Sequence, residues 1–210
     1  MSAQNPAFVI RSVAPAITTV SVPFMRFNRI KFGGRATVVK LSSGNLVVFS
    51  PVALEQEVRD ALQSMGGNVS FLIAPDLEHH LHLAAYKRAF PAAQVIAPLG
   101  LREKRAQQAG AEDVPVDFEL SRDNKATVKL PDEFARDCEI ELFDGHPNRE
   151  IAVLHRPSRT LIQADLMFNL PAHEQFSRSG LDPSTGLLTR LATYITNTQP
   201  GHLGQQRFLW

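Results

Sequence analysis

The 210-residue sequence predicts a layered α/β fold built from mixed β-sheets. Three observations predict it. β-branched, alternating runs that are typical of strands occur in both halves of the chain. Segments with the apolar period of an amphipathic helix stand between them. Residues 69–74 form a nearly continuous apolar run, as expected of a strand buried on both faces. In such a fold we expect the functional loops at the strand ends.

The first half of the chain alternates strand and helix patterns. Ser42–Asn45 has the composition of a hairpin turn, so the two strands that flank it are expected to pair. The period changes after Pro51, and Gly66-Gly67 ends the helix that follows. The predicted elements of this half are strands at 16–22, 36–41, 46–50, 69–74 and 94–97 and helices at 51–64 and 81–90.

The second half predicts a charged, exposed helix, then three consecutive strands, then a helix. Residues 109–137 are polar and give weak signals, and residues 168–180 are expected to form a loop or lid. The predicted elements are helices at 101–108 and 187–196 and strands at 139–143, 150–155 and 160–164, the last two joined by a hairpin turn at 156–159. We expect one domain over residues 1–210, with its core at about 16–170 and a lid and helix region at 171–210.

Composition narrows the class of protein. The formal net charge of +1 gives no electrostatic reason to expect nucleic acid or an anionic membrane as partner. No run approaches the ~20 apolar residues of a membrane span, and Arg11 and Pro15 interrupt the N-terminal apolar stretch, so we do not interpret it as a secretory signal. Cys138, the single cysteine, excludes internal disulfides and is interpreted as structural. We therefore expect a cytoplasmic protein with a small-molecule substrate.

Histidines and carboxylates gather at three points along the chain. Asp76–His82 holds an acidic and histidine-rich cluster, Phe143–His146 ends in a lone histidine after a glycine, and Thr160–Asp165 is a strand that ends in an aspartate. Imidazole and carboxylate are the ligands that hard and borderline divalent metals prefer. The order of these segments predicts a dinuclear metallohydrolase site, or the remains of one.

These segments resemble the metallo-β-lactamase superfamily, and more narrowly an uncharacterised branch of it, a domain family of unknown function found in fungi and bacteria. The likeness covers about residues 16–170. The His-x-His-x-Asp-His motif of the superfamily follows a buried strand and falls here on Ala74–His79. Its later Gly-His falls on Gly145-His146, and its metal-bridging aspartate falls on Asp165. The resemblance implies an αββα sandwich of mixed sheets.

The chain departs from the superfamily's motif at several ligand positions. Ala74 stands where the first histidine is expected, Asp76 where the second is, and Glu78 where the aspartate is, whereas His79 is retained. His80 is an additional histidine. No counterpart of the superfamily's last histidine is visible, so the chain resembles a shortened member without the last strand and helix. An unpaired sheet edge left in that way would favour a homodimer.

The resemblance implies a divalent metal, zinc, iron or manganese, and the reduced ligand set favours one ion over two. The candidate metal ligands are Asp76, Glu78, His79, His80, His146 and Asp165. The implied activity is hydrolysis of a small ester, thioester, lactone or phosphoester. The alternative is a catalytically inactive domain that serves as a binding or structural protein, so the sequence leaves open whether the protein is an enzyme. A redox role for bound iron is a minor third reading.

Structural roles compete with ligation at the same positions. Asp76 could cap the following helix, with Glu78 favourable in its first turn. Asp165 could cap a turn at the strand end, and His79 and His146 could be hydrogen-bonded loop or core residues. Asp144 is a candidate to orient His146 from outside the ligand set. No role in the site is expected of His82, His155 or His173, and His202 does not match the superfamily's last histidine.

Overall fold

The computed structural model describes residues 8–196. Its centre is a seven-stranded sheet with the strand order β1-β2-β5-β6-β7-β8-β9. The strands from β1 to β6 pair antiparallel, and those from β6 to β9 pair parallel, so the sheet is mixed as predicted. The strands are β1 (Val9–Ala14), β2 (Ile17–Val22), β5 (Gly34–Lys40), β6 (Leu46–Phe49), β7 (Val69–Ile73), β8 (Gln94–Pro98) and β9 (Phe118–Leu120).

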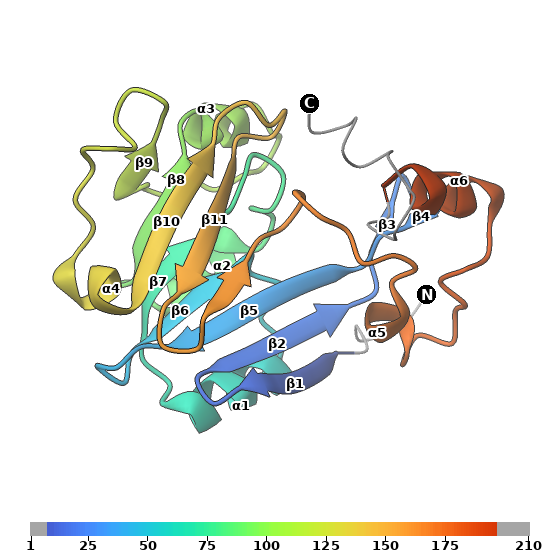
Figure 1. Cartoon of the computed structure of the whole chain (residues 1–210), viewed down its shortest axis with the longest axis horizontal. Coiled ribbons are helices and arrows are strands. Elements are labelled where there is room, and N and C mark those ends of the chain that lie inside the picture. The colour runs from blue at the N-terminus through green and yellow to red at the C-terminus, as the bar shows by residue number, and fades with distance from the viewer. Residues whose placement is uncertain (1–7, 197–210) are drawn as a thin grey trace.

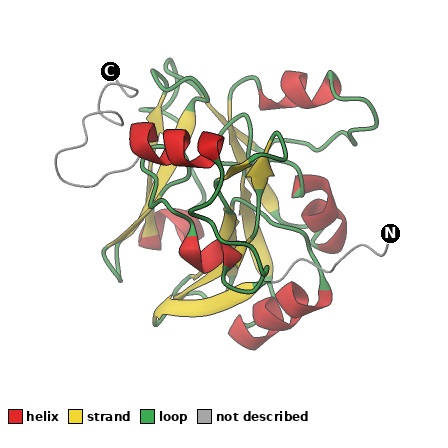
Figure 2. Ribbon diagram, turned by 90° about the vertical axis from the view of Figure 1, so that its right-hand side faces the viewer, coloured by secondary structure: helices red, strands yellow, loops and turns green. Residues whose placement is uncertain are grey.

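The central strands β6, β7 and β8 are buried on both faces of the sheet, which explains their nearly continuous apolar sequences. On one face, Val48 and Leu72 pack in a hydrophobic core with residues of α1 (Gln56–Met65), α2 (Leu83–Ala89) and α3 (Leu101–Ala106). On the other face, their chain neighbours Val47 and Phe71 pack in a second core. Successive side chains of a strand point to opposite faces, so these strands supply both cores at once. Figure 1 shows α1 and α2 behind the large sheet, and Figure 2 shows the strands stacked centrally with helices around them.

A three-stranded antiparallel sheet covers the second core. It consists of β10 (Cys138–Phe143), β11 (Glu150–His155) and β12 (Thr160–Ile162), preceded by the short helix α4 (Asp132–Asp137). Leu142 and Ile151 point into the second core. Leu161, on the outer face, is 56% exposed. Within residues 8–196, no helix covers that outer face in Figure 1. The shortening inferred from the sequence stays a prediction.

The remaining elements lie beside the edge of the large sheet. They are the two-stranded sheet of β3 (Met25–Arg26) and β4 (Ile30–Lys31), and the helices α5 (His173–Phe176) and α6 (Leu187–Thr196). Glu174 attaches α5 to the large sheet: its carboxylate accepts hydrogen bonds from Ser21 Oγ (2.8 Å) and Arg35 Nη2 (3.1 Å) and pairs with Arg11 Nη2 (2.7 Å). Residues 168–180, expected to form a loop or lid, thus contain a helix that hydrogen bonds and ion pairs attach to β1, β2 and β5.

The attachment of α5 is expected to depend on pH. Burial alone would raise the pKa of Glu174, but the Ser21 hydroxyl and the two arginines lower it below its usual 4.5. A depressed folded-state pKa stabilises the folded chain above the unfolded value, and that stability is lost as the pH falls through the folded-state pKa. We expect Glu174→Gln to cost about 1–2 kcal/mol at pH 7 and progressively less below pH ~4.5. Urea unfolding at pH 7 and at a pH below ~4.5 measures the cost of the substitution. An equal cost at the two pH values would contradict the prediction.

Tyr86 offers a second stability test. Its side chain, on α2, is fully buried, and its hydroxyl has no hydrogen-bond partner in the described part of the chain. Burial raises the pKa of this phenol, so the hydroxyl stays neutral. A buried polar group without a partner costs free energy. We expect Tyr86→Phe to raise the free energy of unfolding by about 1 kcal/mol, whereas a loss of similar size would show that the hydroxyl has a stabilising partner.

The fold class expected from the sequence is confirmed, with errors at element ends and in the region of weak signals. The helix expected at 51–64 begins only at Gln56, and the one expected at 81–90 begins at Leu83. The elements that sequence analysis missed are β1, β3, β4, β9, α4 and α5. The short elements carry too few residues to show a period, and β1 is an edge strand with exposed residues on both faces.

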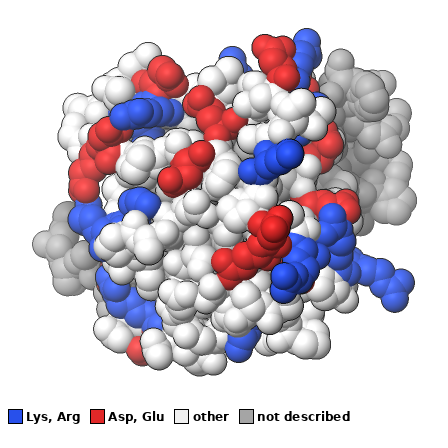
Figure 3. Space-filling model, turned by 90° about the vertical axis from the view of Figure 1, so that its left-hand side faces the viewer, with Lys and Arg blue, Asp and Glu red and all other residues white. Residues whose placement is uncertain are grey.

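Two surface properties bear on partners. Among residues 8–196 there is no helix with the length and apolar character needed to cross a bilayer. On the face shown in Figure 3, acidic and basic side chains are interspersed. That face therefore lacks the single-sign basic area that nucleic-acid binding requires.

Candidate metal centre

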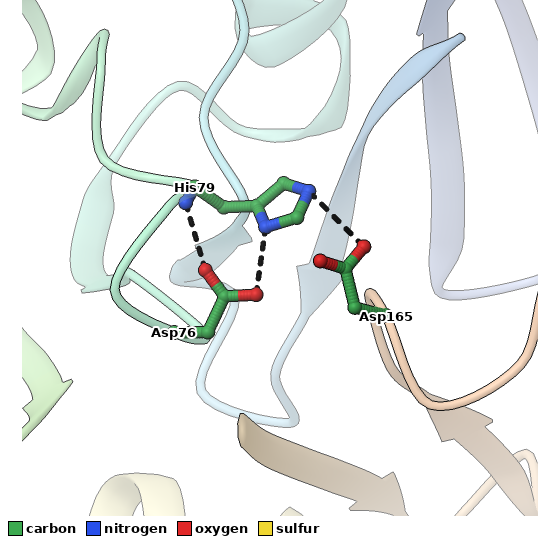
Figure 4. A group of neighbouring side chains, drawn as sticks. All are labelled: Asp76, His79 and Asp165. Atoms are coloured by element: carbon green, nitrogen blue, oxygen red, sulfur yellow. Dashed lines mark hydrogen bonds and ion pairs between the residues drawn. The ribbon is translucent and has the colours of Figure 1, made fainter. Parts of the chain in front are cut away.

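Three loops at strand ends form the candidate centre. The loop after β7 carries Asp76 and His79, the β10–β11 loop carries His146, and the segment after β12 carries Asp165. The Leu77 amide joins the first two loops by donating to the Asn148 carbonyl (3.1 Å), and the Ile151 amide of β11 donates to the Pro75 carbonyl (2.6 Å). Donor atoms of Asp76, His79 and Asp165 all lie within 4.8 Å of one another. We call these three residues the metal cluster (Figure 4).

Asp76 holds His79 in a fixed orientation. Its Oδ1 accepts hydrogen bonds from the backbone amides of Glu78 (2.7 Å) and His79 (2.8 Å), and its Oδ2 accepts one from Nδ1 of His79 (2.8 Å). Asp76 therefore caps the turn before α2 and not the helix itself, whose N-cap is His82. With Nδ1 donating to a carboxylate, the other ring nitrogen is the one available to a metal. That nitrogen, Nε2, lies 3.9 Å from Oδ1 of Asp165.

Asp165 is held by two residues of the neighbouring β-hairpin. Asn148 Nδ2 donates to Oδ2 of Asp165 (3.0 Å). Glu150, fully buried at the start of β11, accepts hydrogen bonds from the backbone amides of Ala164 (2.6 Å) and Asp165 (2.7 Å). One Asp165 oxygen is thus bound by Asn148, while the other faces His79.

His146 lies beside this arrangement without being one of the three clustered residues. It is mostly buried, and its Nδ1 accepts a hydrogen bond from the backbone amide of Asn148 (3.3 Å). The loop that carries His146 is therefore the same one that places Asn148 on Asp165.

The electrostatics of the cluster favour a positive charge. Burial alone would lower the pKa of His79, but the hydrogen bond to Asp76 and the charges of Asp76, Asp165 and Glu150 raise it to about 9. Burial raises the pKa of Glu150 to about 7 and also raises that of Asp165. Asp76, by contrast, has a pKa lowered against the effect of its burial by the hydrogen bonds of His79. Protonated His79 is the cation that these carboxylates stabilise.

The donor set fits one divalent cation. Ligand atoms about 2.0–2.2 Å from a metal lie roughly 3.0–3.5 Å apart in octahedral or tetrahedral geometry. The 3.9 Å between His79 Nε2 and Asp165 Oδ1 is close to that spacing. Asp76 has both oxygens engaged and is placed as the carboxylate that orients a ligating histidine. Imidazole and carboxylate together suit zinc, iron or manganese.

The structure gives other contacts to two of the predicted ligands. Glu78 forms an ion pair with Lys104 of α3. His80 is buried, and its Nδ1 and carbonyl oxygen lie 3.2 and 2.9 Å from Nη1 of Arg105. Neither belongs to the metal cluster. His79 thus joins the metal cluster, whereas the next residue, His80, contacts Arg105.

Other positions that the sequence singled out have structural surroundings. Ala74, at the first ligand position of the motif, is fully buried in the core beneath α1 and α2. Asp144, considered as a partner for His146, pairs with Arg122. His155 is buried, and its Nδ1 lies 2.7 Å from Ser158 Oγ. These surroundings account for Ala74, Asp144 and His155 by structural roles that involve no metal.

Sequence analysis missed Asn148 and Glu150. Glu150 is the first residue of a buried strand. A carboxylate in a buried strand is expected to be hydrogen-bonded, and this was the available signal. Asn148 stands in the Gly145–Asn148 loop, where a turn role is the simpler explanation. Its contact with Asp165 spans 17 residues of sequence, and no local pattern could have revealed it.

Comparison with known proteins identifies the family of the chain. A family model described as a domain of unknown function, DUF4336, matches residues 27–190. The chain belongs to this family. No curated protein sequence matches this DUF4336 chain.

Solved structures show that the DUF4336 chain has a metallo-β-lactamase-like fold. The metallo-β-lactamase IND-7 superposes with a TM-score of 0.61 and 11% identity, covering 98% of this chain and 99% of that one. The metallo-β-lactamase DIM-1 exposed to ceftazidime gives 0.60 and 12%, covering 99% and 96%. A metallo-β-lactamase from Pontibacter korlensis gives 0.57 and 10%, covering 79% and 74%. At these identities the likeness establishes the fold alone, and it confirms the fold class inferred from the motifs.

Proposed function

We propose that this protein binds one divalent cation at the metal cluster and acts as a metal-dependent hydrolase of a small ester, thioester, lactone or phosphoester. The single observation that carries the proposal is the approach of His79 Nε2 to Asp165 Oδ1 (3.9 Å), with each side chain fixed by a further carboxylate or amide. Buried side chains that are held by hydrogen bonds and converge on one point are typical of metal sites.

Each residue has a separate part in this proposal. His79 and Asp165 would hold the cation, and His146 would complete the set from the neighbouring loop. Asp76 keeps the His79 ring in the tautomer that exposes Nε2, and Asn148 orients Asp165. When bound, such a cation lowers the pKa of a coordinated water to near ~7 and polarises a carbonyl or phosphoryl oxygen. Glu78 and His80 are no longer proposed as ligands, since both are engaged elsewhere.

A second candidate function is a domain without catalysis that binds a ligand or supports another protein. The observation that favours it is the engagement of Asp76, Glu78 and His80 in protein contacts, which leaves few donors for a metal. A cytoplasmic location and a homodimer remain proposals from the sequence and depend on neither function.

Metal titration of the chelator-treated full chain tests the proposal. We expect zinc, manganese or ferrous iron to bind with one ion per chain in isothermal titration calorimetry. His146→Ala is expected to weaken that binding, because a ligand is lost. His173→Ala is the matched control, since His173 is exposed at the start of α5, and should leave it unchanged.

Hydrolysis assays on the metal-loaded protein then separate the two functions. Turnover of an ester, thioester, lactone or phosphoester that disappears with chelator supports the hydrolase. Stoichiometric binding without turnover of any of these classes supports the second function. Absence of binding by all three metals would refute the metal centre itself.

A further inference from the structure

A buried arginine lies on the opposite side of the loop that carries His79. Arg105, on α3, is only 6% exposed. It lines a cavity of about 260 Å³ between α2 and the loop that follows α3. Figure 1 shows α2 and α3 as separate helices joined through β8, and the lining residues of the cavity come from the stretch 81–112 that contains both helices. The metal cluster does not line this cavity.

The hydrogen bonds of Arg105 all go to neutral acceptors. Its Nη1 donates to the His80 carbonyl (2.9 Å) and lies 3.2 Å from His80 Nδ1, and its Nη2 donates to the Glu112 carbonyl (2.9 Å). Its Nε–H has no hydrogen-bond partner within residues 8–196. A guanidinium can only donate, so the Nδ1 of His80 that it contacts carries no proton, and this imidazole is a neutral acceptor.

Arg105 also has no ion-pair partner among the described residues. This distinguishes it from Arg102 of the same helix, which pairs with Asp113 (2.8 Å). A guanidinium removed from water without a counter-charge is costly. Two of its five N–H groups, Nε–H and one on Nη2, still have donor capacity after the bonds above are made. The wall of the cavity therefore includes a cation with unused donor capacity, and the Nε–H group of that cation is itself shielded from solvent.

The other polar groups of the cavity support an anion there. Arg88 and His82 line it together with Gln108, and Glu112 is the only carboxylate in its lining. The Glu112 carboxylate is on the rim, 56% exposed, where it pairs with Arg88. A second cavity of about 510 Å³ shares His82 and Arg88 with the first and adds Arg59 and the carboxylate of Glu55. Arginines thus outnumber carboxylates across both cavities.

We propose that the cavity beside Arg105 binds the phosphate group of a small molecule or a free phosphate ion. Arginine donors recognise phosphate oxygens with strong, charge-assisted hydrogen bonds. A volume of about 260 Å³ exceeds the ~30 Å³ of one water several-fold, so a phosphate group fits. The adjoining cavity has room for an organic moiety. The site does not rest on the proposed metal centre.

A phosphate titration of the metal-free full chain, kept in chelator, tests the site. The readout is the ¹H–¹⁵N signal of the Arg105 Nε–H group, which we expect to shift and saturate with inorganic phosphate but not with equal ionic strength of sodium chloride. Glu112→Gln removes the carboxylate of the lining and frees Arg88. We expect this variant to bind phosphate about three- to tenfold more tightly.

Two charge-matched variants locate the effect. Arg88→Gln is expected to weaken phosphate binding by about three- to tenfold. Arg102→Gln removes the same charge from outside the cavity and should change the affinity by less than about twofold. Equal losses in the two variants would show non-specific charge attraction and overturn the proposal. So would an unshifted Arg105 Nε–H signal, or an affinity that Glu112→Gln leaves unchanged.

A comparison of ligands then distinguishes the two phosphate sources. Tighter binding of glycerol phosphate than of inorganic phosphate, lost in Arg59→Gln, supports a small phosphorylated molecule that extends into the second cavity. Equal affinities, insensitive to Arg59→Gln, support the free ion.

Discussion

Replacement of His79 by alanine is expected to reduce the affinity of the chain for a divalent cation by more than about a hundredfold. His79 supplies the one clustered imidazole, and its Nε2 faces Asp165 at 3.9 Å. Asp76→Asn is expected to cost about ten- to a hundredfold, the range for residues that orient a metal-binding histidine. An asparagine still accepts the backbone amides, but its amino group cannot accept the Nδ1–H of His79.

Calorimetric titration of the three proteins with zinc measures both effects. His82→Ala is the control, because His82 stands in the same turn but lines the cavities on the other side. A larger loss in Asp76→Asn than in His79→Ala would show that Asp76 is itself a ligand. Unchanged affinity in His79→Ala would contradict the metal cluster.

Replacement of Glu150 by glutamine is expected to lower the free energy of unfolding by about 2–4 kcal/mol. Both carboxylate oxygens accept backbone amides, those of Ala164 and Asp165, in a fully buried position. Glutamine offers one oxygen, and its amino group would face the other amide donor. Each buried donor left without a partner costs about 1–3 kcal/mol, and the misplaced amino group adds to this.

Glu141→Gln provides the matched control on the neighbouring strand. Glu141 is exposed and paired with Lys125, and exposed ion pairs contribute roughly 0–1 kcal/mol. Urea unfolding of both variants should therefore give clearly different losses. Glu150→Gln is also expected to weaken metal binding, because Asp165 loses its backbone anchor. Similar stability of the two variants would contradict the positioning role of Glu150.

The large sheet could be predicted because its strands are periodic and buried. Val47 and Val48 face the two cores in alternation, so the strand Leu46–Phe49 is apolar throughout. The run 69–74 is apolar except for Ser70 for the same reason. The segments 118–120 and 132–137 could not be predicted, because they are short and each buries only part of its length.

Residues of the candidate site could be predicted only where residue type and position at a strand end indicate metal-binding chemistry. His79 and Asp165 were found from residue type and position at strand ends, and the structure brings them together. Glu78 is a carboxylate like Asp165, and His80 is an imidazole like His79. In the structure, however, Glu78 contacts Lys104 and His80 contacts Arg105. The direction of a side chain in an irregular turn depends on tertiary contacts, which sequence spacing does not encode.

The proposed role of Asp76 could not be predicted for a related reason. Its position suggested either ligation or helix capping. It combines a cap on the turn before α2 with a hydrogen bond to His79. Such a dual contact depends on how the chain turns at the two residues between Asp76 and His79, which the turn geometry alone decides.

The most direct test is X-ray diffraction from zinc-soaked crystals of the full chain, measured on both sides of the zinc absorption edge. We predict one strong anomalous peak per chain, between His79 Nε2 and Asp165 Oδ1 and bordered by the loop of His146. A peak elsewhere, or none at saturating zinc, would contradict the proposed metal centre.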